Sequence, residues 1–276
     1  MTDLVTRAYE TELAWLALGH SLRRTKHTTF VREPRAPEVY DANFAAFPRA
    51  RTPAEIDAAI AEIEAEFASA EHRQIFWDPG TPLPFEARLQ LDDYVAHDEV
   101  VLALEGALGA RVRADVEIRP AERDADWEAI TELCWLDHEE EVKKGFHGPW
   151  PRSITERIVA CKRWKAPAVR FFVARVEGVD CGFFSGFPGE NGVGLVEDLY
   201  TRDDFRGRGV ATALVAACVA DARARGAGPV LIGARPDDTP KQMYAAMGFR
   251  PLCVRRAYLR VPPGSPLRPG SAAAPA

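Results

Sequence analysis

Apolar and polar residues follow two different periods in the second half of the chain. Runs of alternating or β-favouring residues predict strands over 116–119, 169–176, 181–187, 194–201 and 249–259. Apolar residues at spacings of three and four predict helices that begin near 127, 153, 211 and 239. The short apolar run 230–234 does not alternate, as expected for a strand buried on both faces. This order predicts an α/β fold with a mixed sheet.

The first part of the chain repeats the later half of this order in weaker form. Strand-like runs lie at 27–31, 73–77 and 99–104, and helical patterns lie at 52–67 and 85–92. Thr52 and Glu55 have the spacing of a capping box at the start of the first of these helices. We interpret this part as a degenerate half-domain that packs against the later one. The alternative is an unrelated α/β extension.

Composition narrows the class of protein. The chain has 276 residues with 47% hydrophobic content, which suffices for two domains. A net charge of -6 argues against nucleic-acid binding and suits a cationic substrate. Five cysteines without CxxC pairs suggest neither zinc nor disulfides. The start of the chain lacks a signal-peptide pattern, and no stretch of 18 apolar residues occurs, so we expect a cytoplasmic protein without membrane contact.

The loop at 204–212 carries the clearest chemical signal. It lies between a predicted strand and a predicted helix, where the N–H groups of the helix start can bind an anion. Gly207 and Gly209 allow close approach of the main chain, and Arg206 and Arg208 add positive potential. The loop lacks the Lys-Ser/Thr ending of a P-loop, and Thr212 replaces the third glycine of a dinucleotide motif. Alone, the tetrapeptide is also compatible with a solvated loop or an RNA-binding fragment.

Two linked motifs resemble the GNAT N-acetyltransferases. The family signature Arg/Gln-x-x-Gly-x-Gly/Ala is matched at Arg206, Gly209 and Ala211, and the signature Tyr-x-x-x-Gly-Phe is matched over 244–249. The resemblance covers about residues 115–261 and implies an acyl-CoA-dependent N-acyltransferase with a GNAT fold. The predicted domains are a degenerate GNAT-like segment at 1–112, a GNAT domain at 113–261 and a disordered tail at 262–276, the last from its Pro, Gly, Ser and Ala content.

The resemblance also implies where the acyl donor, acetyl-CoA, binds. The main chain of Leu199, Tyr200 and Thr201 would bind pantetheine, because the strand 195–201 resembles the splayed fourth strand of the family. The loop and helix start would hold the pyrophosphate through Arg206, Gly207, Arg208, Gly209, Val210, Ala211 and Thr212. Asp237 is assigned to the same site, although the family often has Asn there. No metal is expected.

Two residues are candidates for the proton transfers. The resemblance implies that Tyr244 protonates the departing thiolate, and packing beside Met243 and Met247 is the alternative interpretation. Glu197 is the candidate base for the amine, with pairing to an arginine as its alternative. Strand alternation predicts that Asp198 points to the opposite face, so that only one of the two acids reaches the substrate.

The expected acceptor is a primary amine of a small molecule or a peptide. The acidic run 137–141 could attract it, and Phe146 and Trp150 could line its pocket; a solvated face and core anchors are the alternatives. A catalytically inactive acyl-CoA-binding regulatory module is the main competing function, and a purely structural tandem protein is the third. The oligomeric state, monomer or homodimer, stays open.

Overall fold

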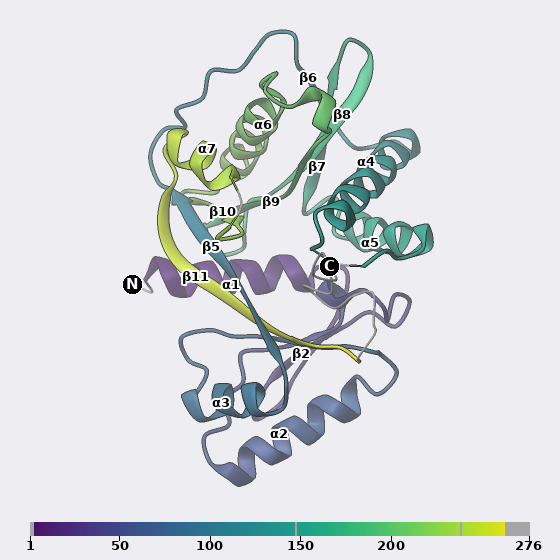
Figure 1. The fold of residues 1–276 in the computed structure, drawn as a ribbon. Helices are drawn as coiled ribbons and strands as arrows, with labels where there is room; N and C mark the ends of the chain where they lie inside the picture. Colours follow the sequence, from purple (N-terminus) through teal and green to yellow (C-terminus); the bar gives the residue numbers. More distant parts are fainter. Residues whose placement is uncertain (1–2, 147, 238, 263–276) are drawn as a thin grey trace, which may run out of the picture. The chain divides into compact units, whose positions relative to one another are not determined.

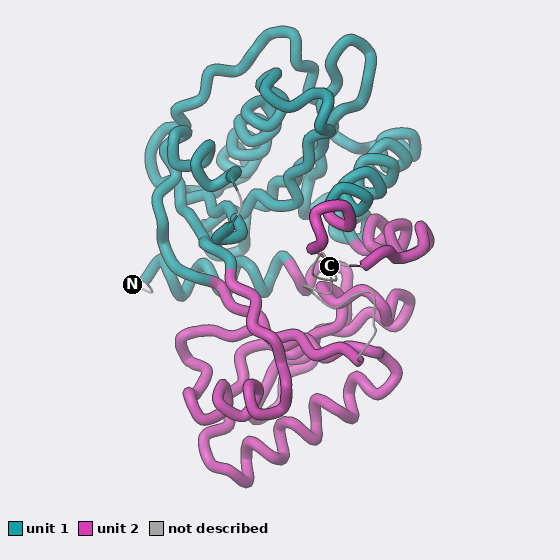
Figure 2. Tube along the Cα trace, viewed as in Figure 1, with its two compact units in different colours: residues 1–15, 99–140, 162–254 teal, residues 16–98, 141–161, 255–276 magenta. Residues whose placement is uncertain are grey.

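The computed structural model describes residues 3–146, 148–237 and 239–262, and the predicted tail lies outside these residues except for residue 262. The chain forms two compact units, shown in Figure 2. Unit 1 comprises residues 1–15, 99–140 and 162–254, and unit 2 comprises residues 16–98, 141–161 and 255–276. Each unit therefore combines residues from the first and the second part of the chain.

The sheet of unit 1 has the strand order β5-β10-β9-β8-β7-β6. The strands are β5 (Val95–Leu104), β6 (Glu117–Pro120), β7 (Arg170–Val176), β8 (Val179–Phe187), β9 (Gly194–Thr201) and β10 (Val230–Ala234). β9 and β10 run parallel, and the neighbouring pairs are antiparallel. The prediction of a mixed sheet is therefore confirmed.

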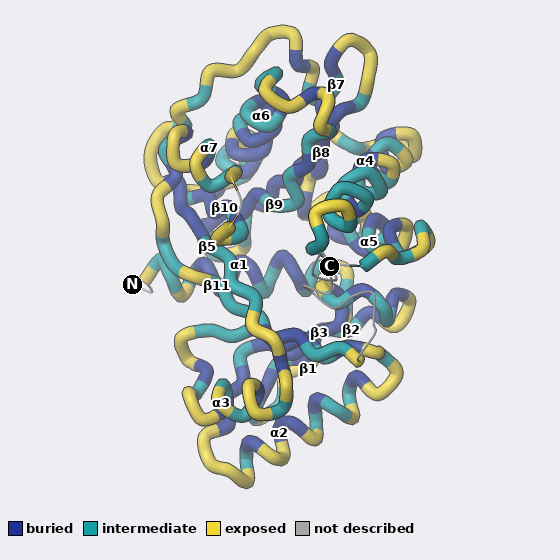
Figure 3. The backbone as a smooth tube through the Cα atoms, viewed as in Figure 1, coloured by how far each residue is buried: buried dark blue, intermediate teal, exposed yellow. Residues whose placement is uncertain are grey.

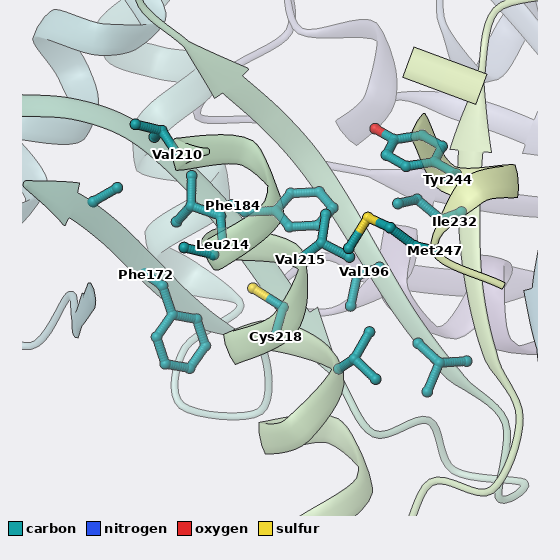
Figure 4. Close-up of a cluster of buried hydrophobic side chains, with 14 of the residues drawn as sticks. Phe172, Phe184, Val196, Val210, Leu214, Val215, Cys218, Ile232, Tyr244 and Met247 are labelled. Atoms are coloured by element: carbon teal, nitrogen blue, oxygen red, sulfur yellow. The ribbon is translucent and has the colours of Figure 1, made fainter. Parts of the chain in front are cut away.

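Unit 1 contains α4 (Asp124–Lys143) up to residue 140, α6 (Val210–Ala224) and α7 (Pro240–Ala246), which the sequence patterns predict, and most of α1 (Leu4–Ala17), which they do not; these helices are drawn in Figure 1. Helix α5 (Arg152–Trp164) is also predicted, and only its residues 162–164 belong to unit 1. The buried face of α6 places Leu214, Val215 and Cys218 in a cluster with β8, β9 and β10, shown in Figure 4. None of the helices in the described part of the chain combines the length and the hydropathy needed to span a bilayer.

Unit 2 has a second sheet segment with the order β1-β2-β3-β4-β11. The strands are β1 (Ser21–Arg24), β2 (Thr29–Arg32), β3 (Phe44–Ala46), β4 (Arg73–Phe76) and the end of β11 (Arg250–Arg260), with the helices α2 (Pro53–Glu66) and α3 (Leu83–Leu91). Its core contains Phe30, Ile63, Phe67, Phe85 and Tyr258, each at most 1% exposed. The patterns over 52–67 and 73–77 predict α2 and β4, whereas α1, β1 and β3 were not predicted.

The order of elements in unit 2 repeats that of unit 1. β3, a loop, α2, β4 and α3 follow one another like β9, a loop, α6, β10 and α7, and the strand pairs β3–β4 and β9–β10 are both parallel. Each series ends in a long strand, β5 or β11. Residues 100–104 of β5 pair with β10, whereas residues 257–260 of β11 pair with β4. The two series thus exchange their last strands.

Candidate active site

The parallel strands β9 and β10 separate halfway along their length. Register pairs join Gly194, Leu195 and Val196 of β9 to residues 230–232 of β10, and no described pair continues beyond Ile232, although β9 runs on to Thr201. Antiparallel pairing with β8 still holds Tyr200 and Thr201 in place. Main-chain groups of residues 197–201 on the β10 side are therefore not used by that ladder and can bind an extended ligand. The predicted splay of this strand is present.

A β-bulge at Asp198 changes which side chains share a face. Asp198 has a φ of 74°, and the pairing of β8 with β9 shifts register between Phe183 and Ser185. Val196 and Leu199 pack in the α6 cluster, whereas Asp198 bonds to Lys162 of α5. Strand alternation therefore fails at this point, and the expectation that Glu197 and Asp198 point to opposite faces is wrong. Asp198 instead has the arrangement of a structural ion pair.

The loop before α6 has the backbone of an anion-binding turn. Gly207 and Gly209 have φ values of 72° and 83°, which other residues rarely adopt. Gly209 is the N-cap of α6, and no described side chain caps this helix start. The first N–H groups of α6 therefore point to a ligand or to water. Val210 is 1% exposed and packs in the core, so only its main chain is suited to binding.

Both arginines of this loop form ion pairs with neighbouring acidic residues. Arg206 Nε donates to the Thr201 carbonyl at 3.0 Å, and its guanidinium also pairs with Glu140. Arg208 pairs with Glu177 at 2.8 Å. These contacts join the loop to the end of β9 and leave both positive charges beside the start of α6, where they favour an anion.

Glu140 links the acidic run 137–141 to the loop before α6. Its carboxylate accepts a hydrogen bond from the Tyr200 hydroxyl at 2.7 Å and also pairs with Arg206. Burial, and then the contact with Glu140, raise the pKa of Tyr200. This member of the run therefore joins α4 to the end of β9 and to the loop before α6, a role that the sequence pattern did not indicate. Tyr200 directs its side chain to α4, which is consistent with the predicted use of its main chain.

Tyr244 lies on α7 inside the apolar cluster of unit 1. It is 3% exposed, and its ring centroid lies 6.1 Å from that of Phe249. Figure 4 shows its ring at the edge of the cluster, near Met247 and Ile232. The packing interpretation is therefore correct as far as the ring is concerned. The hydroxyl group is held in a fixed position by the same packing, as a proton donor requires.

Glu197 lies beside Gly233 of β10. Its Oε2 atom is 3.4 Å from the position that a Cβ atom would occupy on Gly233. The carboxylate therefore reaches across the place where β9 and β10 separate, and its side chain is half-buried. This is where an acceptor would approach a ligand held along β9.

The remaining predicted residues are placed as follows. Asp237 is exposed in the turn after β10, 3.6 Å from Arg235 Nε. Trp150 and Phe146 belong to unit 2, and Trp150 Nε1 donates to Thr155 Oγ1 at 3.1 Å. Thr155 is buried, so this contact agrees with the interpretation of Trp150 as a packing anchor.

Within residues 3–146, 148–237 and 239–262, no group of three or more His, Cys, Asp or Glu side chains is placed to hold a metal ion.

The corresponding helix start in unit 2 is already occupied by a carboxylate. Thr52 and Glu55 form the predicted capping box, and Glu55 Oε2 accepts from the N–H groups of Arg51 and Thr52 at 3.1 and 3.2 Å. These bonds lower the pKa of Glu55 to about 2. The preceding loop has no glycine, and its Arg49 pairs with Asp78. An internal anion thus takes the place that an external anion can take at α6.

Splayed parallel strands beside an uncapped, glycine-flanked helix start suit an extended ligand that carries an anionic group. Residues 127–249 match the model of the acetyltransferase (GNAT) family, so this part of the chain is a GNAT domain and the protein is an N-acyltransferase. A search of curated proteins finds no significant match.

Solved structures show the same fold over most of the chain. A GCN5-related N-acetyltransferase from Kribbella flavida has a TM-score of 0.68 at 17% identity, with 97% of this chain and 100% of that chain covered. A tandem GNAT protein from the clavulanic acid biosynthesis pathway has a TM-score of 0.56 at 16% identity, with 86% and 81% covered. A GCN5-related N-acetyltransferase from Sphaerobacter thermophilus has a TM-score of 0.54 at 16% identity, with 87% and 82% covered. The chain therefore has a GNAT fold in tandem arrangement.

Proposed function

We propose that the chain transfers the acetyl group of acetyl-CoA to a primary amine of a small molecule or a peptide. Residues 113–261 form the catalytic domain in this proposal, and residues 1–112 form its degenerate partner. The uncapped start of α6 beside splayed β9 is the observation that carries it. The capped start of α2 supports a single coenzyme site per chain.

The coenzyme site consists of the main chain and the charged loop. N–H groups between Gly207 and Thr212, with Arg206 and Arg208, bind the pyrophosphate. Main-chain groups of Leu199, Tyr200 and Thr201 bind the pantetheine arm, because the ladder to β10 leaves this stretch open. Asp237 belongs to the same proposed site through its position after β10. The acetyl thioester then lies where β9 and β10 separate.

Two side chains transfer the protons. Glu197, directly or through water, takes a proton from the ammonium group, so that the nitrogen lone pair can attack the acetyl carbon. A main-chain N–H of β9 stabilises the oxyanion. The attacking nitrogen loses its second proton to water, the carbon–sulfur bond breaks, and Tyr244 donates its proton to the thiolate. Acetylated amine and coenzyme A leave, Glu197 releases its proton to solvent, and Tyr244 takes a proton back from solvent.

Calorimetric titration of acetyl-CoA into the full-length chain tests the proposal without knowledge of the acceptor. We expect one site per chain. Two sites would contradict the degeneracy of the N-terminal part, and absence of binding to acetyl-CoA and to longer acyl-CoAs would refute the coenzyme site. An inactive acyl-CoA-binding regulatory module would bind acetyl-CoA but acetylate no amine in a subsequent screen.

A further inference from the structure

The bulge in β9 directly follows the point where this strand leaves β10. The register with β10 ends at Val196. On the β8 side, the register joins Glu197 and then Tyr200, and only Phe184 of β8 lies opposite the two residues between them. Neither described register includes residues 198 and 199. The main chain of these two residues is therefore placed to contact a ligand beside the open edge of β9.

Asp198 has a backbone conformation that needs support from its surroundings. Its φ of 74° lies in the left-handed region, which residues other than glycine seldom adopt, although aspartate tolerates it better than most. A strained residue of this kind persists only where neighbouring contacts stabilise it, and such residues cluster at functional sites. The contacts that hold Asp198 therefore bear on the function of the bulge.

Side chains of β8 and α5 hold the bulge. Ser185 Oγ, on a fully buried residue of β8, donates to the Glu197 carbonyl at 2.8 Å. Lys162 Nζ, on α5, donates to Asp198 Oδ1. The side chains of Lys162 and Asp198 are 14% and 18% exposed, so solvent screens this ion pair less than a surface pair. The serine fixes the residue before the bulge, and the lysine stabilises the residue with the positive φ.

We propose that Lys162 is a positioning residue that holds the bulge, through Asp198, so that a main-chain N–H of β9 donates to the thioester carbonyl of acetyl-CoA. This inference rests on the proposed function, in which such an N–H stabilises the oxyanion. Lys162 itself contacts neither substrate. Without the ion pair, Asp198 relaxes toward a negative φ, and the peptide group beside it turns. The N–H then no longer points to the carbonyl, and the barrier to attack rises.

Infrared spectroscopy of acetyl-CoA, isotope-labelled at the thioester carbonyl and bound to the full-length chain, tests the inference. A hydrogen bond to a carbonyl oxygen lowers its stretching frequency, so the wild type should shift this band below that of free acetyl-CoA. Lys162→Met keeps the apolar stem and removes the charge, so the band should return toward the free value. Acetyl-CoA affinity, measured by calorimetry, should fall by at most about tenfold, the contribution of one hydrogen bond. Arg163→Met removes the neighbouring pair between α5 and Asp124 of α4 and, as the matched control, should keep the wild-type band.

Two double variants separate the conformation of the bulge from the effect of an unpaired carboxylate. Lys162→Met leaves the Asp198 carboxylate without this lysine, and both double variants remove that carboxylate. Lys162→Met with Asp198→Gly should restore the lowered frequency, because glycine adopts a φ of 74° without strain. Lys162→Met with Asp198→Ala should not restore it, because alanine is strained at this φ. If Lys162→Met does not fold, these two double variants decide the question by themselves.

Four results would overturn the inference. They are a wild-type band at the free frequency, a Lys162→Met variant that keeps the wild-type shift, an Arg163→Met variant that loses it equally, and equal bands in the two double variants. Each of them leaves the coenzyme site intact, because acetyl-CoA is bound in the experiment. A wild type that does not bind acetyl-CoA would instead refute the proposed function, and the inference with it.

Discussion

Single residues show where local sequence rules hold and where packing changes them. Asp198 is the clearest case, because the bulge with its φ of 74° turns its carboxylate to Lys162. Alternation is a property of a regular strand, and one extra residue shifts every later side chain to the other face. Glu197 precedes the bulge and keeps its regular orientation. Of the two acids, it is therefore the candidate base.

Tyr244→Phe separates catalysis from packing at the residue scale. The substitution keeps the buried ring and removes only the hydroxyl, so kcat should fall by about tenfold or more while acetyl-CoA affinity stays within about twofold. Steady-state kinetics and calorimetry measure the two quantities. Tyr94→Phe is the matched control, because Tyr94 is also 5% exposed or less and belongs to unit 2. Equal losses of turnover and of coenzyme affinity in Tyr244→Phe would contradict the role of an acid.

Glu33 provides a test of the pH dependence of stability. Its side chain is 3% exposed, and the hydrogen bond from Arg35, opposed by burial, lowers its pKa from 4.5 to about 2. A lowered pKa means that the folded state prefers the ionised form, so this contribution is complete above pH 4.5 and disappears as the pH falls to about 2. The wild type should therefore be more stable than Glu33→Gln at neutral pH, and the difference should shrink over this range. Urea unfolding at a series of pH values measures it; a constant difference would contradict the assignment.

At the scale of elements, two helix starts with the same place in the topology have opposite chemistry. At the start of α2 the Glu55 carboxylate accepts hydrogen bonds from the N–H groups of Arg51 and Thr52, whereas α6 begins at Gly209 without a side-chain cap. Both features are visible in the sequence, as a capping box and as a glycine-rich loop. The capping box was predicted and is confirmed. The sequence did not show that α2 and α6 begin at equivalent places. That equivalence follows from the structure, in which β3 and α2 have the same topology as β9 and α6.

Gly209→Ala tests the coenzyme loop as an element. A Cβ atom on Gly209 would lie 2.9 Å from Arg113 Cδ, at a φ of 83°. The substitution should cost about 1 kcal/mol of stability and weaken acetyl-CoA binding by about tenfold, because the main chain must shift. Gly178→Ala is the matched control, since Gly178 has a φ of 80° and no atom near its Cβ position. It should show a similar loss of stability in thermal unfolding and unchanged acetyl-CoA affinity; equal losses of affinity would contradict the site.

On the scale of the whole molecule, the exchange of β5 and β11 makes the two parts of the chain depend on each other. Residues 102 and 104 of β5 are buried in the core of unit 1, and Tyr258 of β11 is buried in the core of unit 2. The connection over residues 105–115 is mostly exposed, as Figure 3 shows. Cutting the chain there would separate the halves without cutting a core element.

Residues 113–276 expressed alone should therefore fail to form a stable GNAT domain. β10 would keep one unpaired edge, and the core would lose Leu102 and Leu104. Co-expression with residues 1–112 should restore cooperative thermal unfolding and acetyl-CoA binding. Circular dichroism and calorimetry on the fragment and on the reconstituted pair measure this. A fragment that binds acetyl-CoA with wild-type affinity would show that β5 is dispensable.

The sequence by itself determined the local elements and the coenzyme loop of this protein. Helical periodicity, the capping box at Thr52 and the glycines at 207 and 209 each depend on residues that are close in the chain. They can therefore be recognised from the sequence without knowledge of the fold. Tertiary structure alone decided the bulge at Asp198, the pairing of Glu140 with Arg206, the exchange of β5 with β11 and the approach of Glu197 to Gly233. These features join residues that are distant in the chain or depend on the register between strands. Long-range pairing has no periodic signature, and for that reason it becomes visible only in the folded molecule.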